Sequence, residues 1–230
     1  FLAHWLSWRK PRLLQHLNAA INGNLWSTTL NRFKPKAYYE KKDISQYFWP
    51  NGKIPSSHEW KKLAENNFKD YKLKIGGLVD HPAELSLEEL KNLGMQQNIT
   101  MHHCIQGWSG IAEWGGIPIS KIIELVKPHA AATTIAFYSF GEGLYGGYYY
   151  DTNTIDNCLK PQSILAWEMN YESLPLVYGA PLRLGVENQL GYKMVKWISS
   201  IEFLQTHETI GKGFGGKNED DEYFDLLANT

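Results

Sequence analysis

The chain has 230 residues, of which 43% are hydrophobic and 20% are charged, so it can bury one sizeable core. Its 23 basic and 24 acidic residues nearly cancel, which argues against a nucleic-acid partner or an anionic membrane held by net charge. No run of about 18 apolar residues occurs, so no membrane-spanning helix is expected within it.

Residues 1–45 are expected to form an N-terminal arm, because they hold too few periodic apolar positions for a core of their own. Near its start, Trp5 and Trp8 stand close to Arg9 and Arg12, a mixture typical of segments that lie at a membrane edge. An ordinary amphipathic helix that packs on the rest of the chain is the alternative. No secretion signal is visible.

Residues 46–230 are predicted to form one domain with many strands and few helices. Ser86 can cap a helix while Glu89 reaches back to it, and Gly94 can end that helix in a left-handed conformation. Further helices are expected at 59–66 and 120–126, and strands at 71–75, 98–104, 133–138, 148–150, 163–169, 181–186 and 196–203. This order indicates an α+β fold richer in sheet than in helix. The glycine-rich, then acidic tail at 211–222 is predicted to be an irregular surface segment.

The densest unusual stretch runs from Met101 to Ser109 and holds Cys104, one of only 2 cysteines in the chain. A thiol placed there is a candidate metal ligand. Zinc is not favoured, because His102, His103 and Cys104 alternate between the two faces of a strand and no CxxC or HxxxH completes a tetrahedral set. Two other interpretations remain open: the nucleophile of a cysteine-dependent hydrolase, or a small buried residue in a binding module without a cofactor.

Three glycines, Gly141, Gly143 and Gly146, formally match a dinucleotide-binding fingerprint that follows a predicted strand. That motif requires a helix directly afterwards, whose N-terminal amides contact the pyrophosphate. Residues 147–151 are typical of a strand or a turn instead. The sequence therefore predicts no nucleotide site here.

A second dense stretch runs from Tyr178 to Phe203. Its Arg183 can bind a phosphate through a two-pronged guanidinium, and its glycines near Lys193 and Lys196 let backbone amides approach a phosphate closely. Together with the stretch around Cys104, the segments 114–118 and 165–175 and the spacing of all four, it resembles the molybdenum-cofactor domain of the sulfite oxidase superfamily. The resemblance covers about residues 47–203. It implies a sheet-rich α+β enzyme domain of that type, a molybdopterin-binding catalytic domain, at residues 46–230.

The resemblance also implies the cofactor and its contacts. Molybdenum would be bound by a single pterin, molybdopterin in its mononucleotide form, and by one protein thiolate, which matches Cys104. The cofactor-binding positions implied in this way are Phe48, Trp49, Asn51, Cys104, Ser139, Tyr178, Arg183, Lys193, Met194, Val195 and Lys196. Tyr178 stands where relatives often carry Asn or His, and the loop at 48–52 lacks the basic residue that sulfite oxidases carry there.

The family exchanges an oxygen atom with its substrate, and the charge of that substrate can be argued from the arginines. A site for sulfite needs a cluster of cations, best supplied by arginines. The chain has only 4 arginines, at positions 9, 12, 32 and 183, of which three lie in the N-terminal arm and one is implied to bind the pterin. We therefore expect a small neutral sulfur or nitrogen oxide as substrate, with sulfite oxidation as the alternative.

The residues that follow Cys104 fit that expectation. The candidate catalytic residues are Cys104, Gln106, Trp108 and His103. With His102 or His103 they would form a nearly neutral pocket with an aromatic wall, as in the related methionine-sulfoxide reductases, which carry an acid where this chain has Gln106. One phenol of residues 148–150 could contact the substrate oxygen.

Relatives exchange electrons with haem proteins, so the resemblance implies a b-type or c-type cytochrome partner. It also implies a periplasmic or membrane-associated location, with membrane association through the N-terminal side. Only 27 residues follow Phe203, too few for the superfamily's dimerisation domain of about 100 residues. A monomer, or a subunit docked on a haem protein, is the expectation.

Overall fold

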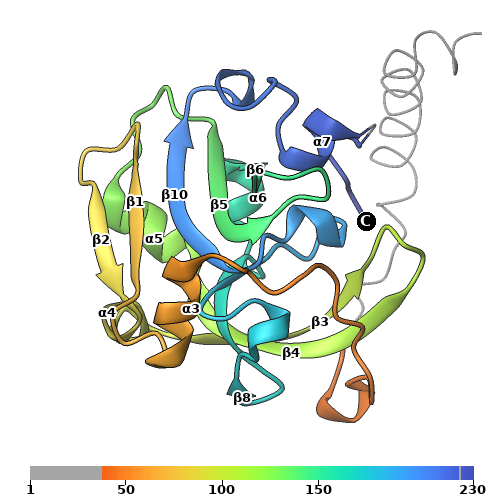
Figure 1. Ribbon diagram of the computed structural model, residues 1–230. Coiled ribbons are helices and arrows are strands. Elements are labelled where there is room, and N and C mark those ends of the chain that lie inside the picture. Colours follow the sequence, from red (N-terminus) through yellow and green to blue (C-terminus); the bar gives the residue numbers. More distant parts are fainter. Residues whose placement is uncertain (1–37, 223) are drawn as a thin grey trace, which may run out of the picture.

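Two five-stranded sheets make up the body of the protein in residues 38–222 and 224–230, which the computed structural model describes (Figure 1). The first sheet has the order β2 (Ala83–Ser86), β1 (Lys72–Gly77), β10 (Ile198–Leu204), β5 (Thr134–Glu142) and β6 (Tyr148–Thr154). The second has the order β3 (Gln96–His103), β4 (Ser109–Pro118), β7 (Ile164–Met169) and β8 (Glu172–Ser173), with β9 (Arg183–Gly185) paired to β7. Strands β1 and β10 are parallel, and the other pairs are antiparallel.

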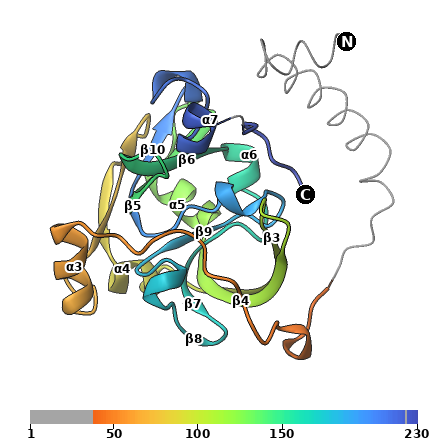
Figure 2. The same cartoon turned by 45° about the vertical axis from the view of Figure 1, so that its right-hand side comes forward.

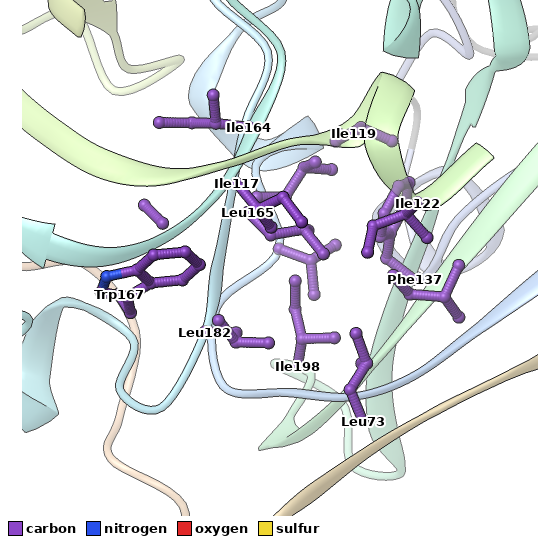
Figure 3. Close-up of a cluster of buried hydrophobic side chains, with 14 of the residues drawn as sticks. Leu73, Ile117, Ile119, Ile122, Phe137, Ile164, Leu165, Trp167, Leu182 and Ile198 are labelled. Atoms are coloured by element: carbon purple, nitrogen blue, oxygen red, sulfur yellow. The ribbon is translucent and has the colours of Figure 1, made fainter. Parts of the chain in front are cut away.

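Large apolar side chains from both sheets form the core. In β1, Leu73 and Ile75 are buried while the alternate residues Lys72 and Lys74 are exposed, which is the period of a half-buried strand. Figure 3 shows Leu73 near Phe137 of β5, Ile198 of β10 and Ile117 and Leu165 from the second sheet, and all five side chains are fully buried. Each such burial stabilises the fold by about 1.5–3 kcal/mol.

Short helices cover the sheets. In chain order they are α3 (His58–Glu65), α4 (Leu87–Asn92), α5 (Ile119–Val126), α6 (Ile155–Cys158) and α7 (Lys217–Asp221), with 3₁₀ turns η2 (Lys41–Asp43), η3 (Leu176–Tyr178), η4 (Gly191–Lys193) and η5 (His207–Thr209). The start of α4 carries the predicted capping box of Ser86 and Glu89. Among the residues described, no helix is long and apolar enough to cross a membrane.

The predicted α+β, sheet-rich class is confirmed, and the predicted helices and most predicted strands lie within a few residues of the observed ones. The three glycines of the fingerprint-like motif lie at the end of β5 and in its hairpin to β6, with no helix after them. Cys158 lies in α6, and both cysteines are free thiols. Residues 1–37 of the expected N-terminal arm lie outside the described residues, so its proposed membrane association stays a prediction.

One prediction about the tail is wrong. Residues 211–222 were expected to be an irregular surface segment, but they include α7, in which Glu219 and Asp220 are buried. The carboxylate of Glu219 pairs with the ammonium of Lys193, and Asp220 accepts hydrogen bonds from the backbone N–H groups of Lys212 and Phe214. These partners allow acidic side chains to be buried.

Candidate functional site

Cys104 lies where β3 ends and the turn to β4 begins. Its backbone N–H donates to the carbonyl of Trp108 (2.9 Å), and its own carbonyl accepts from Gly107 (3.1 Å), which has a φ of +86°. Glycine adopts this left-handed conformation without strain. The side chain of Cys104 is 7% exposed. The thiol is therefore held at a fixed point at the end of a hairpin, close to the surface.

Asn51 connects this thiol to the second dense stretch of the sequence. Its side-chain amide donates to the sulfur of Cys104 at 3.8 Å, and its backbone carbonyl accepts a hydrogen bond from the ammonium of Lys196. The predicted metal ligand and one of the predicted phosphate contacts thus share a neighbour. Tyr178 supports the same loop, because its hydroxyl donates to the carbonyl of Phe48 (2.7 Å).

Arg183 and Lys196, which we call the basic clamp, both donate to backbone carbonyls of the turn η3. The guanidinium of Arg183 donates to the carbonyl of Tyr178 (3.1 Å) and lies 4.7 Å from the ring centre of Trp114. The ammonium of Lys196 donates to the carbonyl of Val177 (3.0 Å) and lies over the ring of Trp197 at 4.1 Å.

The charges of the basic clamp have no carboxylate partner among the described residues. Burial lowers the pKa of Arg183 to about 10, although the nearby Cys104 thiol acts in the opposite direction. Burial, with a further effect of Arg183, lowers the pKa of Lys196 to about 7. Withdrawing cations from water without a counter-charge is costly, so the clamp is suited to an anion.

Aromatic side chains surround the clamp and the thiol. The ring of Phe48 packs edge-on against Trp108, Trp114 and Tyr178, with ring centres 5.5–5.9 Å apart. The indole N–H of Trp108 is buried and has no hydrogen-bond partner in the described part of the chain. Such an unmet donor is unusual in a folded protein and indicates a place where an acceptor can bind.

His102, and not His103, is the histidine that lies with these residues. Its ring packs against Phe48 and Trp108, and its Nδ1 is 3.3 Å from the sulfur of Met194. Burial, helped by the charge of Arg183, lowers the pKa of His102 to about 3, so the ring is neutral at neutral pH. His103 instead bonds its cross-strand partner Ser109 (Nδ1 to Oγ 2.9 Å).

A small hollow adjoins Arg183 of the clamp. Arg183, His102, Trp114 and Met194 line it, together with residues of β3, β7 and β9. Cys104 does not belong to its lining, so the hollow reaches the clamp and the neighbours of the thiol but does not open onto the sulfur itself.

The structure brings together most of the cofactor contacts implied by the sequence. Ser139 accepts from the N–H of Gly141 (2.8 Å) and donates to the carbonyl of Lys196 (2.6 Å), so it supports the clamp. Gly179, absent from the sequence prediction, separates the two cations, because a Cβ there would lie 3.1–3.2 Å from the Cβ atoms of Lys196 and Arg183. The only sequence signal for it was its place directly after Tyr178.

Other predicted residues lie apart from this group. The ammonium of Lys193 pairs with Asp151 and Glu219, so this side chain is not available to a phosphate, and its predicted cofactor contact stays a prediction for the backbone alone. Val195 is buried in the core, and Trp49 and Gln106 are exposed.

The tyrosines of β6 do not fit their suggested role as substrate contacts. The hydroxyl of Tyr149 donates to the carbonyl of Tyr192 (2.7 Å), and that of Tyr150 bonds Asp220. Tyr148 is exposed. The phenols of Tyr149 and Tyr150 are thus committed to η4 and to the tail.

This arrangement of one thiol, a basic clamp and two sheets fits a domain that binds a molybdopterin. Residues 59–210, more than half of the chain, match the family model "Oxidoreductase molybdopterin binding domain", and the chain belongs to this family of molybdopterin-dependent enzymes.

Curated relatives agree with this assignment. The chain is 32% identical over 143 residues to the protein-methionine-sulfoxide reductase catalytic subunit MsrP of Xanthomonas axonopodis pv. citri, covering 58% of this chain and 44% of that protein. It is 33% identical over 148 residues to MsrP of Gluconobacter oxydans, covering 59% and 47%. The chain thus spans about half the length of these relatives.

A solved structure shows the same fold. The sulfane dehydrogenase SoxCD from Paracoccus pantotrophus matches with a TM-score of 0.54 and 18% sequence identity, covering 64% of this chain and 42% of that one.

The residues of the site fit a molybdopterin. Cys104 offers one thiol, and no group of three or more His, Cys, Asp or Glu in the described ranges could hold a metal ion, so a metal here would need most of its ligands from a cofactor. The basic clamp offers a guanidinium and an ammonium without carboxylates to a phosphate, and Trp108 offers an unmet donor.

Proposed function

We propose that this chain carries the catalytic site of a molybdopterin oxidoreductase that transfers an oxygen atom to or from a small neutral sulfoxide or N-oxide. The substrate class rests on the assignment of the nearby cations: Arg183 lies close enough to the thiol to interact with it, but the basic clamp is assigned to the pterin phosphate and is not left for a substrate. The other described neighbours of Cys104 and Trp108 are the amide of Asn51, the ring of Phe48 and the neutral ring of His102. A doubly charged anion finds no counter-charge among these groups.

Each residue has a separate task in this proposal. Cys104 would hold the metal, and the amide of Asn51 would donate to the thiolate sulfur and so stabilise its negative charge. Arg183 and Lys196 would hold the phosphate of the pterin. When bound, the cofactor supplies the two-electron exchange of an oxygen atom, and the protein supplies binding and electrostatics.

The rings near the thiol would select the substrate. Phe48 and Trp108 offer apolar surface to a methyl-bearing or similar small molecule, while the indole N–H of Trp108 is free to donate to an oxygen acceptor. Gln106, in the exposed turn after Cys104, would add a neutral polar group at the entrance.

The alternative of a cysteine-dependent hydrolase has little support in this geometry. Such an enzyme needs a histidine within hydrogen-bonding distance of the thiol. The side chain that bonds the sulfur of Cys104 is Asn51.

An electron partner is a further part of the proposal. The curated relatives are named catalytic subunits, which supports a second subunit for this protein as well. We expect that subunit to carry a b-type or c-type haem and the complex to work in the periplasm or at a membrane.

The test is to purify the protein from a host that makes molybdopterin and to measure bound molybdenum and the fluorescent oxidised pterin. The Cys104→Ser variant should lose most of its molybdenum, whereas Cys158→Ala, which changes the cysteine in α6, should retain it. A reduced dye should drive turnover of methionine sulfoxide, dimethyl sulfoxide or trimethylamine N-oxide. Rapid sulfite oxidation with no reduction of these compounds would refute the neutral-substrate assignment.

A further inference from the structure

Lys193 directly precedes the segment Met194–Lys196 of the site, yet its side chain points elsewhere. Its ammonium is 1% exposed and forms ion pairs with Asp151 and with Glu219, whose Oε1 lies 2.7 Å away. The three residues come from η4, β6 and α7. We call them the buried ion-pair cluster.

One face of β6 holds the turn η4. Tyr149, Asp151 and Asn153 are alternate residues of a strand and therefore point to the same side. The hydroxyl of Tyr149 donates to the carbonyl of Tyr192 (2.7 Å), Asp151 pairs with the ammonium of Lys193, and the amide of Asn153 donates to the carbonyl of Lys193 (3.4 Å). Both the backbone of η4 and the side chain of Lys193 are thus bonded to β6.

The helix α7, in the C-terminal tail, also contacts the turn η4, and it lies beside β6 in both views (Figures 1 and 2). Its Asn218 donates to the hydroxyl of Tyr149 (3.2 Å), and its Glu219 supplies the second carboxylate to Lys193. Burial by itself would lower the pKa of Lys193, but the two carboxylates hold this pKa above its ordinary value. The ammonium therefore stays charged and paired.

The turn held in this way touches the site at both of its ends. A Cβ on Gly191 would come within 2.4 Å of the ring of His102, so the backbone of η4 lies directly against that ring. On the other side of Lys193, the sulfur of Met194 lies 3.3 Å from Nδ1 of His102, and Lys196 belongs to the basic clamp. A shift of η4 would move His102 and the clamp relative to each other.

We propose that Asp151, Lys193 and Glu219 are positioning residues of the molybdopterin site, which hold η4 so that Met194 and Lys196 keep the geometry that retains the cofactor. This inference rests on the proposed function, because the cofactor is what the positioned residues would bind. It also gives the C-terminal helix a role in cofactor binding, although its residues do not contact the basic clamp.

The test compares Glu219→Gln with a matched control, Glu124→Gln, in the full chain. Glu124 lies in α5, is largely exposed and pairs with Lys121 at 3.7 Å, so the chemical change is the same and the position is remote from η4. Release of molybdopterin is followed by the fluorescence of the oxidised pterin, and thermal unfolding is measured with and without cofactor. Release should be about 10-fold faster in Glu219→Gln, the scale seen when outer partners of metal ligands are removed, and unchanged in the control.

A purely structural cluster predicts a different result. If the cluster only stabilises the fold, Glu219→Gln would lower the melting temperature of the loaded and the cofactor-free protein equally and leave the release rate at the wild-type value. That result would overturn the inference. A variant that removes one charge can also fail to fold, since it leaves a buried charge unpaired. The triple variant Asp151→Asn, Lys193→Met, Glu219→Gln removes all three charges together, and it should fold and still release the cofactor faster than the wild type.

Retention equal to wild type in the folded triple variant would also overturn the inference, while leaving the proposed function intact. A wild-type protein that binds no molybdopterin at all would overturn the proposed function and this inference with it.

Discussion

Lys193 and Lys196 belong to the same short stretch of sequence, but the structure gives their charges opposite surroundings. Lys193 is fully buried and faces the carboxylates of Asp151 and Glu219. Lys196 is half-buried and donates to the backbone carbonyls of Asn51 and Val177, with no carboxylate partner among the described residues. A cation paired with internal carboxylates holds the fold in place, whereas a cation without a carboxylate partner is available to an anionic ligand.

The largest expected effect is on stability at the paired lysine. Lys193→Met leaves two carboxylates buried without their cation, and we expect the free energy of unfolding to fall by about 3–5 kcal/mol. Urea unfolding of the cofactor-free protein measures this change. A loss below about 1 kcal/mol would mean that the cluster relaxes easily, and the contrast between the two lysines would then fail.

The unpaired lysine should behave in the opposite way. Lys196→Met should leave the stability of the cofactor-free protein unchanged or raise it, because a partly desolvated charge is removed. The same variant should bind molybdopterin about 10- to 100-fold more weakly, since a charge-assisted hydrogen bond is worth about 1.5–3 kcal/mol. Pterin content after dialysis measures the loss, and Lys160→Met, at an exposed turn, is the control.

The pH dependence of stability sharpens the comparison. The pKa of Lys196 is lowered to about 7 in the folded protein, from about 10.4 in an unfolded chain. Between these values the unfolded chain binds more protons, so the stability of the cofactor-free protein should rise with pH from about 7 to about 10, by at most about 1.4 kcal/mol per pH unit. Lys196→Met should abolish this contribution. An identical pH profile in the variant and the wild type would contradict the assignment.

The smallest effect is expected at the surface. Lys121 and Glu124 form an exposed ion pair in α5, in which water screens the charges. Neither Lys121→Met nor Glu124→Gln should change the melting temperature measurably. This pair sets the lower end of the scale against which the buried lysine is judged.

Local signals were sufficient for α3, α4 and α5, but not for α6, for α7 or for all strands. The helix after Ser86 was predicted from its capping box and Gly94, because these interactions span only a few residues. The long strand β4 was missed, since its glycines disfavour a strand when the sequence is considered alone. At Gly116 a Cβ would lie 2.1 Å from the carbonyl oxygen of Leu165, so the glycine serves a close approach to β7.

The residues of the candidate site also divide into those that the sequence could identify and those that it could not. Cys104, Arg183 and Lys196 could be named from their residue types and from the family resemblance. His103 was named as the candidate catalytic histidine, with His102 as the alternative, whereas the alternation of side chains along β3 places His102 with the site. The role of Lys193 could not be predicted, because its partners come from β6 and from a tail that looked like a surface segment.

By itself, the sequence determined the α+β class, the approximate ends of α3, α4 and α5, and the kinds of groups available for a thiolate-bound metal and a phosphate. Those properties depend on neighbours a few residues apart. Only the tertiary structure decided which cation is paired and which is available, and that Asn51 joins the thiol to the clamp. The desolvation and pairing of a charge depend on side chains that are distant in sequence, and these meet only when the two sheets pack together.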